Sequence, residues 1–294
     1  MQIIQNTKFG YYEVENKPSQ EELNLFYTNK YYQQNHAQYS TVYSADELNY
    51  FNLRFQRYHS IISSTIHQKT LLDIGCGEGF ALNYFNNNGY QVKGIDFSNA
   101  GIQQHNPSLL QGDTCMFGNT YDILNTLCID KQQFGVILLN NVLEHVIDPI
   151  KLLTDIKNIM FDDSILIITV PNDFSTLQQH LIDNNFISSK YWICPPEHLT
   201  YFSFDSLIKL TSFHNYNCIF YMSDYPIEFD LLIDNTNYIN AKQKNDITIG
   251  KQSHLKRIRT ELLLNSISID KTNQYYKSLC DLGLGRQITL FLTK

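Results

Sequence analysis

The sequence predicts an α/β protein whose parallel sheet is covered by helices on both faces. From Lys69 onward, short and continuously apolar runs alternate with segments of helical periodicity. A glycine-rich stretch, GCGEG at 75–79, directly follows the first of these runs. Runs that are apolar throughout are typical of strands buried on both faces, and a bare turn after the first strand is typical of a ligand site in such sheets.

Residues 1–60 are predicted to form an N-terminal helical lid. Apolar residues from Ser44 to Ile66 recur near helical spacing, and Ser44 or Asp46 is expected to cap this helix. Five tyrosines are expected to lie over a bound ligand, with packing inside a helical cap as the alternative: Tyr27, Tyr31, Tyr32, Tyr39 and Tyr43.

Residues 61–222 are predicted to form the core. Its expected strands are TLLDIG, YQVKGIDF, SLLQGD, FGVILLNN, SILIITVPN and YNCIFYM, and its helices include GFALNYFNNNG, DPIKLLTDIKNIM and FDSLIKLTSFHN. Residues 223–285 are mostly helical in pattern and are predicted to be an inserted cap. The segment RQITLFLTK, at 286–294, is then expected to return to the core as its last strand.

Composition favours a soluble cytosolic protein. The net charge is −7, which argues against nucleic acid as a partner. The start of the chain has no signal-peptide pattern, and no apolar run approaches the roughly 18 residues of a membrane helix. The six cysteines are scattered without a C-x-x-C pair, so we expect reduced thiols and a cytoplasmic location.

The spacing of the glycines narrows the choice of ligand class. Gly75, Gly77 and Gly79 form G-x-G-x-G, whereas the dinucleotide fingerprint G-x-G-x-x-G would place its third glycine at Phe80. Backbone N–H groups can approach a ligand closely at such a turn. Asp73, just before it, would repel a diphosphate and suits a ligand with an ammonium group.

Two further carboxylates complete the set of groups that are expected to bind the ligand. Asp96 ends the next strand, where an acid can accept hydrogen bonds from both ribose hydroxyls. Gly112–Asp113 is predicted to end the third strand, where Asp113 would bind an adenine amino group. A nucleoside that carries an amino acid and lacks phosphate fits this set, and that ligand is S-adenosylmethionine.

The motifs resemble those of the class I S-adenosylmethionine-dependent methyltransferases, closest to the ubiquinone-pathway O-methyltransferases and related small-molecule and glycan-precursor enzymes. The matching stretches are LLDIGCGEG, GIDFS, GD, NNVLEHVIDP and SILIITVPN, and the resemblance covers roughly 50–222. It implies a Rossmann-like seven-stranded sheet with strand order 3-2-1-4-5-7-6 and an antiparallel last strand.

The resemblance also implies that an arginine before the first strand binds the cofactor's carboxylate. Arg57 is the better match to this arginine, and Arg54 is the second candidate. The alternative for both is an arginine on a surface helix that is solvated and binds no cofactor. Asn140, at the end of the fourth strand, is expected to face the cofactor's amino group. The full set of cofactor-binding candidates is Arg57, Arg54, Asp73, Gly75, Cys76, Gly77, Asp96, Phe97, Asp113 and Asn140.

Two histidines are candidate bases for the acceptor's proton. His145 follows the fourth strand, and Leu143–His145 is expected to start a helix. His198 lies in the stretch WICPPEHLTYFS, where it would line a pocket with Trp192 and Tyr201. The alternative is that both histidines have structural roles and no part in catalysis. His145 would then stabilise the strand-to-helix junction through hydrogen bonds, and His198 would cap the following helix.

No metal is predicted. Some ubiquinone-type relatives carry E-x-x-E-H, which supplies two carboxylates and an imidazole. Here the first position is Asn141, followed by Glu144 and His145, and the lost charge weakens a site for a hard cation.

The expected reaction is methyl transfer to a small-molecule acceptor, at a hydroxyl of a sugar, nucleotide-sugar or phosphorylated precursor, and a homodimer is kept open. A basic cluster in the insert is expected either to attract an anionic acceptor or to form a solvated helix face: Lys251, Lys256, Arg257 and Arg259. The alternative functions are an NAD-dependent oxidoreductase and a non-catalytic cofactor-binding protein. Methylation of DNA bases is disfavoured, because Asn140–Leu143 lacks the proline pair of those enzymes.

Overall fold

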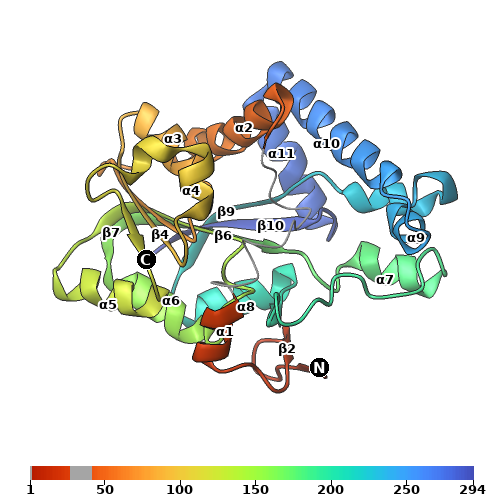
Figure 1. Ribbon diagram of the computed structural model, residues 1–294, viewed down its shortest axis with the longest axis horizontal. Coiled ribbons are helices and arrows are strands. Elements are labelled where there is room, and N and C mark those ends of the chain that lie inside the picture. The colour runs from red at the N-terminus through yellow and green to blue at the C-terminus, as the bar shows by residue number, and fades with distance from the viewer. Residues whose placement is uncertain (1, 27–41) are drawn as a thin grey trace.

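A computed structural model describes residues 2–26 and 42–294. Its core is one seven-stranded sheet between two layers of helices, with a smaller three-stranded sheet beside it (Figure 1). The core strands are β3 (Thr70–Ile74), β4 (Gln91–Asp96), β5 (Cys115–Phe117), β6 (Phe134–Asn140), β7 (Met160–Pro171), β9 (Asn217–Ser223) and β10 (Gln287–Thr293). The core helices are α2 (Ala45–Ile62), α3 (Phe80–Asn87), α4 (Ala100–His105), α5 (Thr120–Ile129), α6 (Pro149–Asn158) and α8 (Phe204–Phe213).

The strand order confirms the prediction. The strands run β5-β4-β3-β6-β7-β10-β9 across the sheet, which is 3-2-1-4-5-7-6 in order of core strands. Strand β10 is antiparallel to both β7 and β9, while β3, β4, β5, β6 and β7 pair in parallel. The order reverses between β3 and β6, and the carboxyl ends of strands at such a point form a ligand crevice.

Alternating side chains of the central strands enter two separate cores. On β6, Val136 and Leu138 pack toward α2 and α3, while Ile137 and Leu139 pack toward α5, α6 and α8. All four side chains are fully buried, each contributing roughly 1.5–3 kcal/mol of stability. This burial on both faces explains why the strand is apolar throughout.

The prediction for the third strand was wrong. Residues Pro107–Leu110 form a 3-10 helix, and Leu109 packs into the core below α3. The strand is β5, so Gly112 and Asp113 precede it instead of ending it. Proline cannot donate to a strand ladder, and Gly112 has a φ of +71°, so both residues favour a turn over a strand here.

The N-terminal region was predicted to be helical, but part of it forms a β-hairpin. Strands β1 (Ile3–Gln5) and β2 (Tyr12–Val14) form a hairpin, and β8 (Thr200–Tyr201) pairs with β2. Helix α1 (Gln20–Phe26) follows, and α2 begins at a capping box in which Ser44 and Glu47 bond each other's backbone N–H. Of the predicted lid tyrosines, Tyr43 is described, and Tyr27, Tyr31, Tyr32 and Tyr39 lie outside the described residues.

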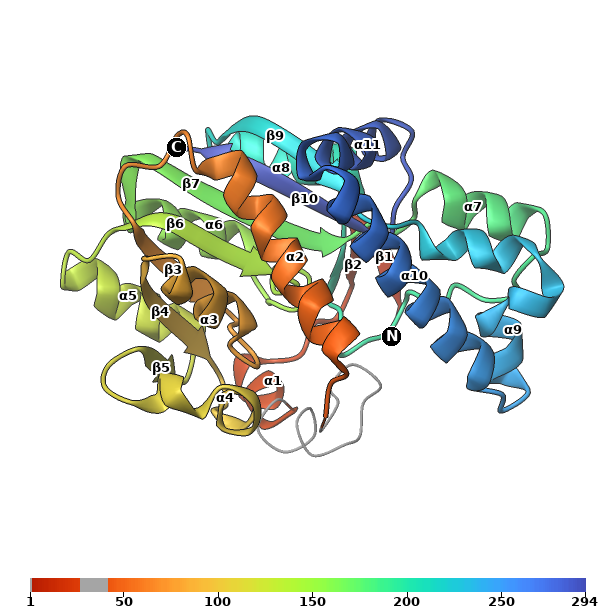
Figure 2. The same cartoon turned by 90° about the horizontal axis from the view of Figure 1, so that it is seen from above.

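The segment 223–285 is a helical insert between β9 and β10, as the pattern indicated. It contains α9 (Tyr238–Gln243), α10 (Thr248–Ile267) and α11 (Ile269–Asp281), together with the 3-10 helices Ile227–Leu232 and Asp234–Thr236. Helix α10 packs across α2, and α9 lies near α7 (Thr176–Asp183) (Figure 2). None of the helices in the described ranges is long and apolar enough to span a membrane.

Candidate functional site

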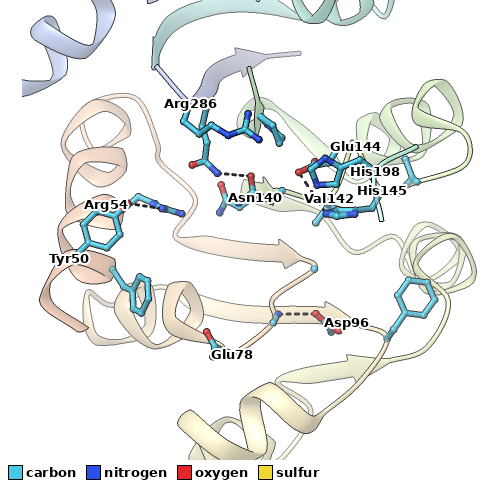
Figure 3. Close-up of a pocket in the computed structure, with 18 of the residues that line it drawn as sticks. Tyr50, Arg54, Glu78, Asp96, Asn140, Val142, Glu144, His145, His198 and Arg286 are labelled. Carbon is cyan, nitrogen blue, oxygen red and sulfur yellow. Dashed lines mark hydrogen bonds and ion pairs between the residues drawn. The ribbon is translucent and has the colours of Figure 1, made fainter. Parts of the chain in front are cut away.

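One large cavity opens at the carboxyl ends of β3, β4 and β6, beneath α2 and α10. Its volume is about 950 Å³. The lining comes from the glycine turn, the ends of β4 and β6, helices α1, α2 and α10, and the segments before β8 and β10. Figure 3 shows side chains from these separate segments pointing into the same space.

The glycine turn is shaped for close approach. Gly75 has a φ of +74°, and a Cβ on it would lie 2.3 Å from Cγ2 of Val142. Gly77 has a φ of +53°, lines the cavity, and has no atom within 4 Å of the position of a Cβ. The first glycine is therefore required by packing, and the second leaves the backbone open to a ligand.

Asp96 lies at the end of β4 and lines the cavity, as predicted, together with Phe97. Its Oδ2 accepts from the Gly77 N–H at 2.8 Å, and its Oδ1 accepts from the Ser98 N–H at 3.1 Å. These two bonds fix the carboxylate against the turn, and Figure 3 shows the bond from the glycine turn. A carboxylate at the end of such a strand is a group that can accept hydrogen bonds from ligand hydroxyls.

The two candidate arginines have different roles in the structure. Arg57 is buried outside the cavity lining and binds Glu261 of α10 at 2.9 Å. Arg54 lines the cavity, and its hydrogen-bond partner among the described residues is the Tyr50 hydroxyl at 3.1 Å. The structure therefore favours Arg54 over Arg57, the better sequence match, as the group that meets a ligand carboxylate.

Three other predicted cofactor residues do not line the cavity. Asp73 is buried in β3, where burial, with a smaller effect of Asp96, raises its pKa to about 7. Cys76 is buried against Cys115, and its pKa is raised mainly by a hydrogen bond with that thiol. Asp113 is exposed and precedes β5, so it lies at the opposite end of this strand from the site. After β5, the cavity is lined instead by Thr120 and Tyr121.

Two asparagines end β6. Asn140 lines the cavity, and its Oδ1 is buried without a hydrogen-bond partner among the described residues. Asn141 has a φ of +53° and accepts from Nε2 of Gln287 at 2.9 Å. An unpartnered buried acceptor favours a ligand that carries a hydrogen-bond donor.

Glu144, His145 and His198 share one wall of the cavity (Figure 3). The prediction of a helix at Leu143–His145 was wrong: this segment is a turn, and α6 begins at Pro149 with Asp148 as its cap. The two imidazole rings lie 4.9 Å apart between centroids. Trp192 and Tyr201 were predicted to line a pocket with His198, but both are buried in a satellite core outside the cavity lining. Tyr201 does lie beside His198, because its hydroxyl donates to the His198 carbonyl oxygen at 3.0 Å.

Burial dominates the ionisation of this wall. It raises the pKa of Glu144 to about 8 and lowers the pKa of His145 to about 4. The hydrogen bond between Nδ1 of His145 and the carbonyl oxygen of Glu197 opposes the lowering at His145. Burial, followed by the charges of His145 and Arg286, lowers the pKa of His198 to about 2. All three side chains are therefore favoured in their uncharged forms near neutral pH.

Several lining residues were not found from the sequence. Glu78 lies inside the glycine motif, accepts from the Tyr43 hydroxyl at 2.7 Å, and has a pKa raised to about 7 by burial. Arg286 precedes β10 and binds Asp173 at 2.9 Å. The position of Glu78 between two motif glycines was an available signal, whereas nothing local in the sequence placed Arg286 in the cavity.

Only part of the predicted basic cluster of α10 lines the cavity. Lys251 and Arg257 line the cavity, whereas Lys256 binds Asp230 and Arg259 is exposed. Arg257 also binds Asp224 at 2.7 Å. One face of α10 therefore brings positive charge to the cavity.

Comparison with known proteins identifies the family. A family model described as a methyltransferase domain matches residues 26–219. The chain belongs to this methyltransferase family. Its fold is the class I fold of these enzymes, with the strand order described above.

Individual relatives agree with the family assignment. Over 108 residues the chain is 32% identical to a ubiquinone biosynthesis O-methyltransferase of Glaesserella parasuis serovar 5 (strain SH0165). The match covers 35% of this methyltransferase and 46% of the curated relative, so it spans about half that protein's length.

Solved structures show the same fold. A SAM-dependent methyltransferase from Archaeoglobus fulgidus has a TM-score of 0.51 at 17% identity, covering 85% of this chain and 95% of that one. The plantazolicin methyltransferase BpumL, in complex with a pentazolic desmethylPZN analog and SAH, also has a TM-score of 0.51. Its identity is 16%, and the match covers 93% of this chain and 97% of that one.

Proposed function

We propose that this methyltransferase binds S-adenosylmethionine and transfers its methyl group to a hydroxyl oxygen of a small-molecule acceptor. The observation that carries the proposal is the continuous cavity that joins the Gly77–Asp96 turn to the wall of Glu144, His145 and His198. Its volume of about 950 Å³ lies near the top of the range for small-molecule sites. That volume suits a cofactor and an acceptor side by side.

The cofactor's parts match the groups around the turn. Asp96 is proposed to accept hydrogen bonds from both ribose hydroxyls, and Asn140 to accept hydrogen bonds from the cofactor's ammonium group. Arg54 is proposed to bind the cofactor's carboxylate. Thr120 and Tyr121 then replace Asp113 beside the adenine. The relatives support this arrangement, because BpumL was solved with SAH.

The acceptor is proposed to lie between the cofactor and the histidine wall. Alignment for in-line transfer can remove roughly 7 kcal/mol of barrier, and proton removal contributes about 10²–10⁴-fold. Burial keeps both imidazoles neutral near pH 7, the form that can accept a proton, but the lowered pKa also makes each ring a weak base without a bound ligand. Lys251 on α10 supports an acceptor with an anionic group, such as a nucleotide-sugar or a phosphorylated precursor.

The free state of all six cysteines supports our further proposal of a cytoplasmic location.

The proposal is tested first by comparing the binding of two ligands and then by measuring methyl transfer. Thermal shift with S-adenosylhomocysteine and with NAD should show stabilisation by the first ligand alone. Isotope-labelled S-adenosylmethionine should then label hydroxyl-bearing acceptors from a panel of sugars, nucleotide-sugars and sugar phosphates. Stabilisation by NAD instead would contradict the proposal, and binding without transfer to any acceptor would indicate a non-catalytic protein.

A further inference from the structure

Two side-chain amides meet in the cavity at the edge of the central sheet. Asn141 directly follows β6, and Gln287 is the first residue of β10. Both residues are half-buried and line the cavity. Nε2 of Gln287 donates to Oδ1 of Asn141 at 2.9 Å. These two side chains, here called the amide pair, are joined across 146 positions of the sequence.

The amide pair lies where the two sides of the cavity meet. Asn140, the neighbour of Asn141, is the residue proposed to accept from the cofactor's ammonium group, and Glu144 of the histidine wall follows three positions later. Figure 3 shows Asn140 between Arg54 and Glu144 in this view. A ligand group bound by the amide pair would therefore lie close to both the cofactor and the histidine wall.

The mutual bond uses only part of the hydrogen-bonding capacity of the pair. Each side-chain amide offers two N–H donors and one carbonyl acceptor. Within the described part of the chain, neither Nδ2 of Asn141 nor Oε1 of Gln287 has a hydrogen-bond partner. The pair thus presents at least one free donor and one free acceptor to the cavity.

Backbone contacts hold both amides in place. The N–H of Asn141 donates to the carbonyl oxygen of Thr169 at 2.8 Å, and this asparagine has a φ of +53°. The N–H of Gln287 donates to Oδ1 of Asp224 at 2.8 Å, and Oδ2 of Asp224 accepts from Arg257 at 2.7 Å. Left-handed residues other than glycine are uncommon and cluster at functional sites. Groups that are fixed before binding lose little freedom when a ligand arrives.

The surroundings favour a neutral ligand group at the amide pair. Arg286, the neighbour of Gln287, binds Asp173 at 2.9 Å and lies 3.7 Å from Glu228, so its charge is offset. Lys251 on α10 lines the same cavity and forms no ion pair with a described residue. An acceptor that reaches both places would carry neutral polar groups at one end and an anionic group at the other.

We propose that Asn141 and Gln287 bind two neighbouring hydroxyls of a sugar ring and thereby select carbohydrate acceptors. A hydroxyl both donates and accepts, so one can accept from Nδ2 of Asn141 while the next donates to Oε1 of Gln287. An apolar or aromatic ring in the same place would leave this donor and this acceptor unpaired, which lowers its affinity. The inference rests on the proposed function, because it names the acceptor of that methyl transfer.

The amide pair is tested by NMR on the full chain with S-adenosylhomocysteine bound. The sugar probes are glucose 6-phosphate, fructose 6-phosphate and uridine diphosphate glucose, and phenyl phosphate and inorganic phosphate are the probes without sugar hydroxyls. The side-chain amide signals are assigned by their absence in Asn141→Gly and Gln287→Met. We expect these signals to shift with at least one sugar probe and to stay in place with phenyl phosphate and inorganic phosphate.

Two variants remove the amides with little change in shape. Asn141→Gly retains the left-handed backbone, and Gln287→Met retains the length of the side chain. Each should weaken binding of the sugar probe by about tenfold, the value of one lost hydrogen bond, and should leave S-adenosylhomocysteine affinity within about twofold. The double variant should lose less than the product of the two effects, because the two amides act on one ligand and on each other.

Asn185→Gly is the matched control. This exposed asparagine follows α7 with a φ of +61°, so the change should alter neither affinity. Binding of S-adenosylhomocysteine reports that each variant is folded, and Gln287→Ala replaces Gln287→Met if the latter does not fold.

Three outcomes overturn the amide pair as a sugar site while S-adenosylhomocysteine still binds. They are equal shifts with phenyl phosphate, unchanged sugar affinity in both variants, and no binding by any of the sugar probes. Failure of wild type to bind S-adenosylhomocysteine contradicts the proposed function instead.

Discussion

The two halves of the cavity are built in different ways. The cofactor half, comprising Gly75, Gly77, Asp96 and Arg54, comes from one continuous stretch of chain around β3 and β4 plus the preceding helix. The acceptor half, comprising Glu144, His145, His198, Lys251 and Arg286, is assembled from segments spread over the rest of the chain. Local backbone shape thus defines the first half, and long-range packing defines the second.

This difference explains how each half is stabilised. In the cofactor half, backbone N–H groups hold Asp96 directly. In the acceptor half, buried ion pairs hold the segments together, among them Arg286 with Asp173 and Arg257 with Asp224. A change in the first half should therefore act on ligand binding, and a change in the ion pairs around the second should act first on stability.

The largest effect is expected at the turn itself. Gly75→Ala adds a Cβ 2.3 Å from Val142 at a φ of +74°, so strain and overlap together should cost about 4 kcal/mol. Binding of S-adenosylhomocysteine should be lost, as measured by calorimetry. Gly89→Ala is the matched control, because its φ is +82° in open space, and it should cost only about 1 kcal/mol. Equal effects of the two changes would show that packing against Val142 is unimportant.

The next effect separates the two arginines. Arg57→Met leaves Glu261 with Arg257 alone, so urea unfolding should show a loss of about 3 kcal/mol. Arg54→Met should leave stability nearly unchanged and weaken S-adenosylhomocysteine binding by roughly 10–100-fold, the value of one hydrogen-bonded charge pair. If the two phenotypes were exchanged, Arg57 would be the cofactor ligand after all.

A comparable effect on binding affinity distinguishes the two aspartates. Asp96→Ala removes the proposed acceptor of both ribose hydroxyls, so affinity for S-adenosylhomocysteine should fall by roughly 100-fold. Asp113→Ala should change affinity by less than about twofold, because this side chain lies at the far end of β5. Isothermal titration on both variants checks the pair, and a large loss at Asp113 would restore the original adenine assignment.

The smallest effect is a dependence on pH. Burial raises the pKa of Glu78 to about 7, so the native state binds more protons than the unfolded state between pH 4.5 and 7. Wild-type stability should therefore fall relative to Glu78→Gln as pH rises through this window, by at most about 1 kcal/mol per pH unit after screening. Thermal melts at several pH values measure it.

Glu47 provides a control of opposite sign. Its pKa is lowered: burial raises it, but the hydrogen bonds to Ser44 outweigh that effect. Wild type should therefore gain stability relative to Glu47→Gln as pH rises toward 4.5. The same slope for both glutamates would contradict the assignment of burial as the cause at Glu78.

Much of the cofactor half followed from the sequence. Gly75, Gly77, Asp96, Phe97 and Asn140 all line the cavity as expected. They could be predicted because a strand followed by a bare turn specifies its geometry within a few residues. Four predicted residues of this half do not line the cavity: Asp73, Cys76, Asp113 and Arg57. Asp73 and Cys76 are buried beside the turn, while a misplaced strand at Asp113 and one helical turn between Arg54 and Arg57 change which side chain faces the cavity.

The sequence by itself determined the alternation of strands and helices, the helical insert and the glycine turn, because apolar runs and glycines act locally through burial and backbone conformation. The strand order was expected only from the resemblance to a known family. Only the tertiary structure decided that His198 meets Glu144 and His145, and that Arg57 binds Glu261. These contacts join segments far apart along the chain, and their geometry depends on how whole elements pack. No local pattern encodes that packing, which is why the acceptor half became visible only in the folded chain.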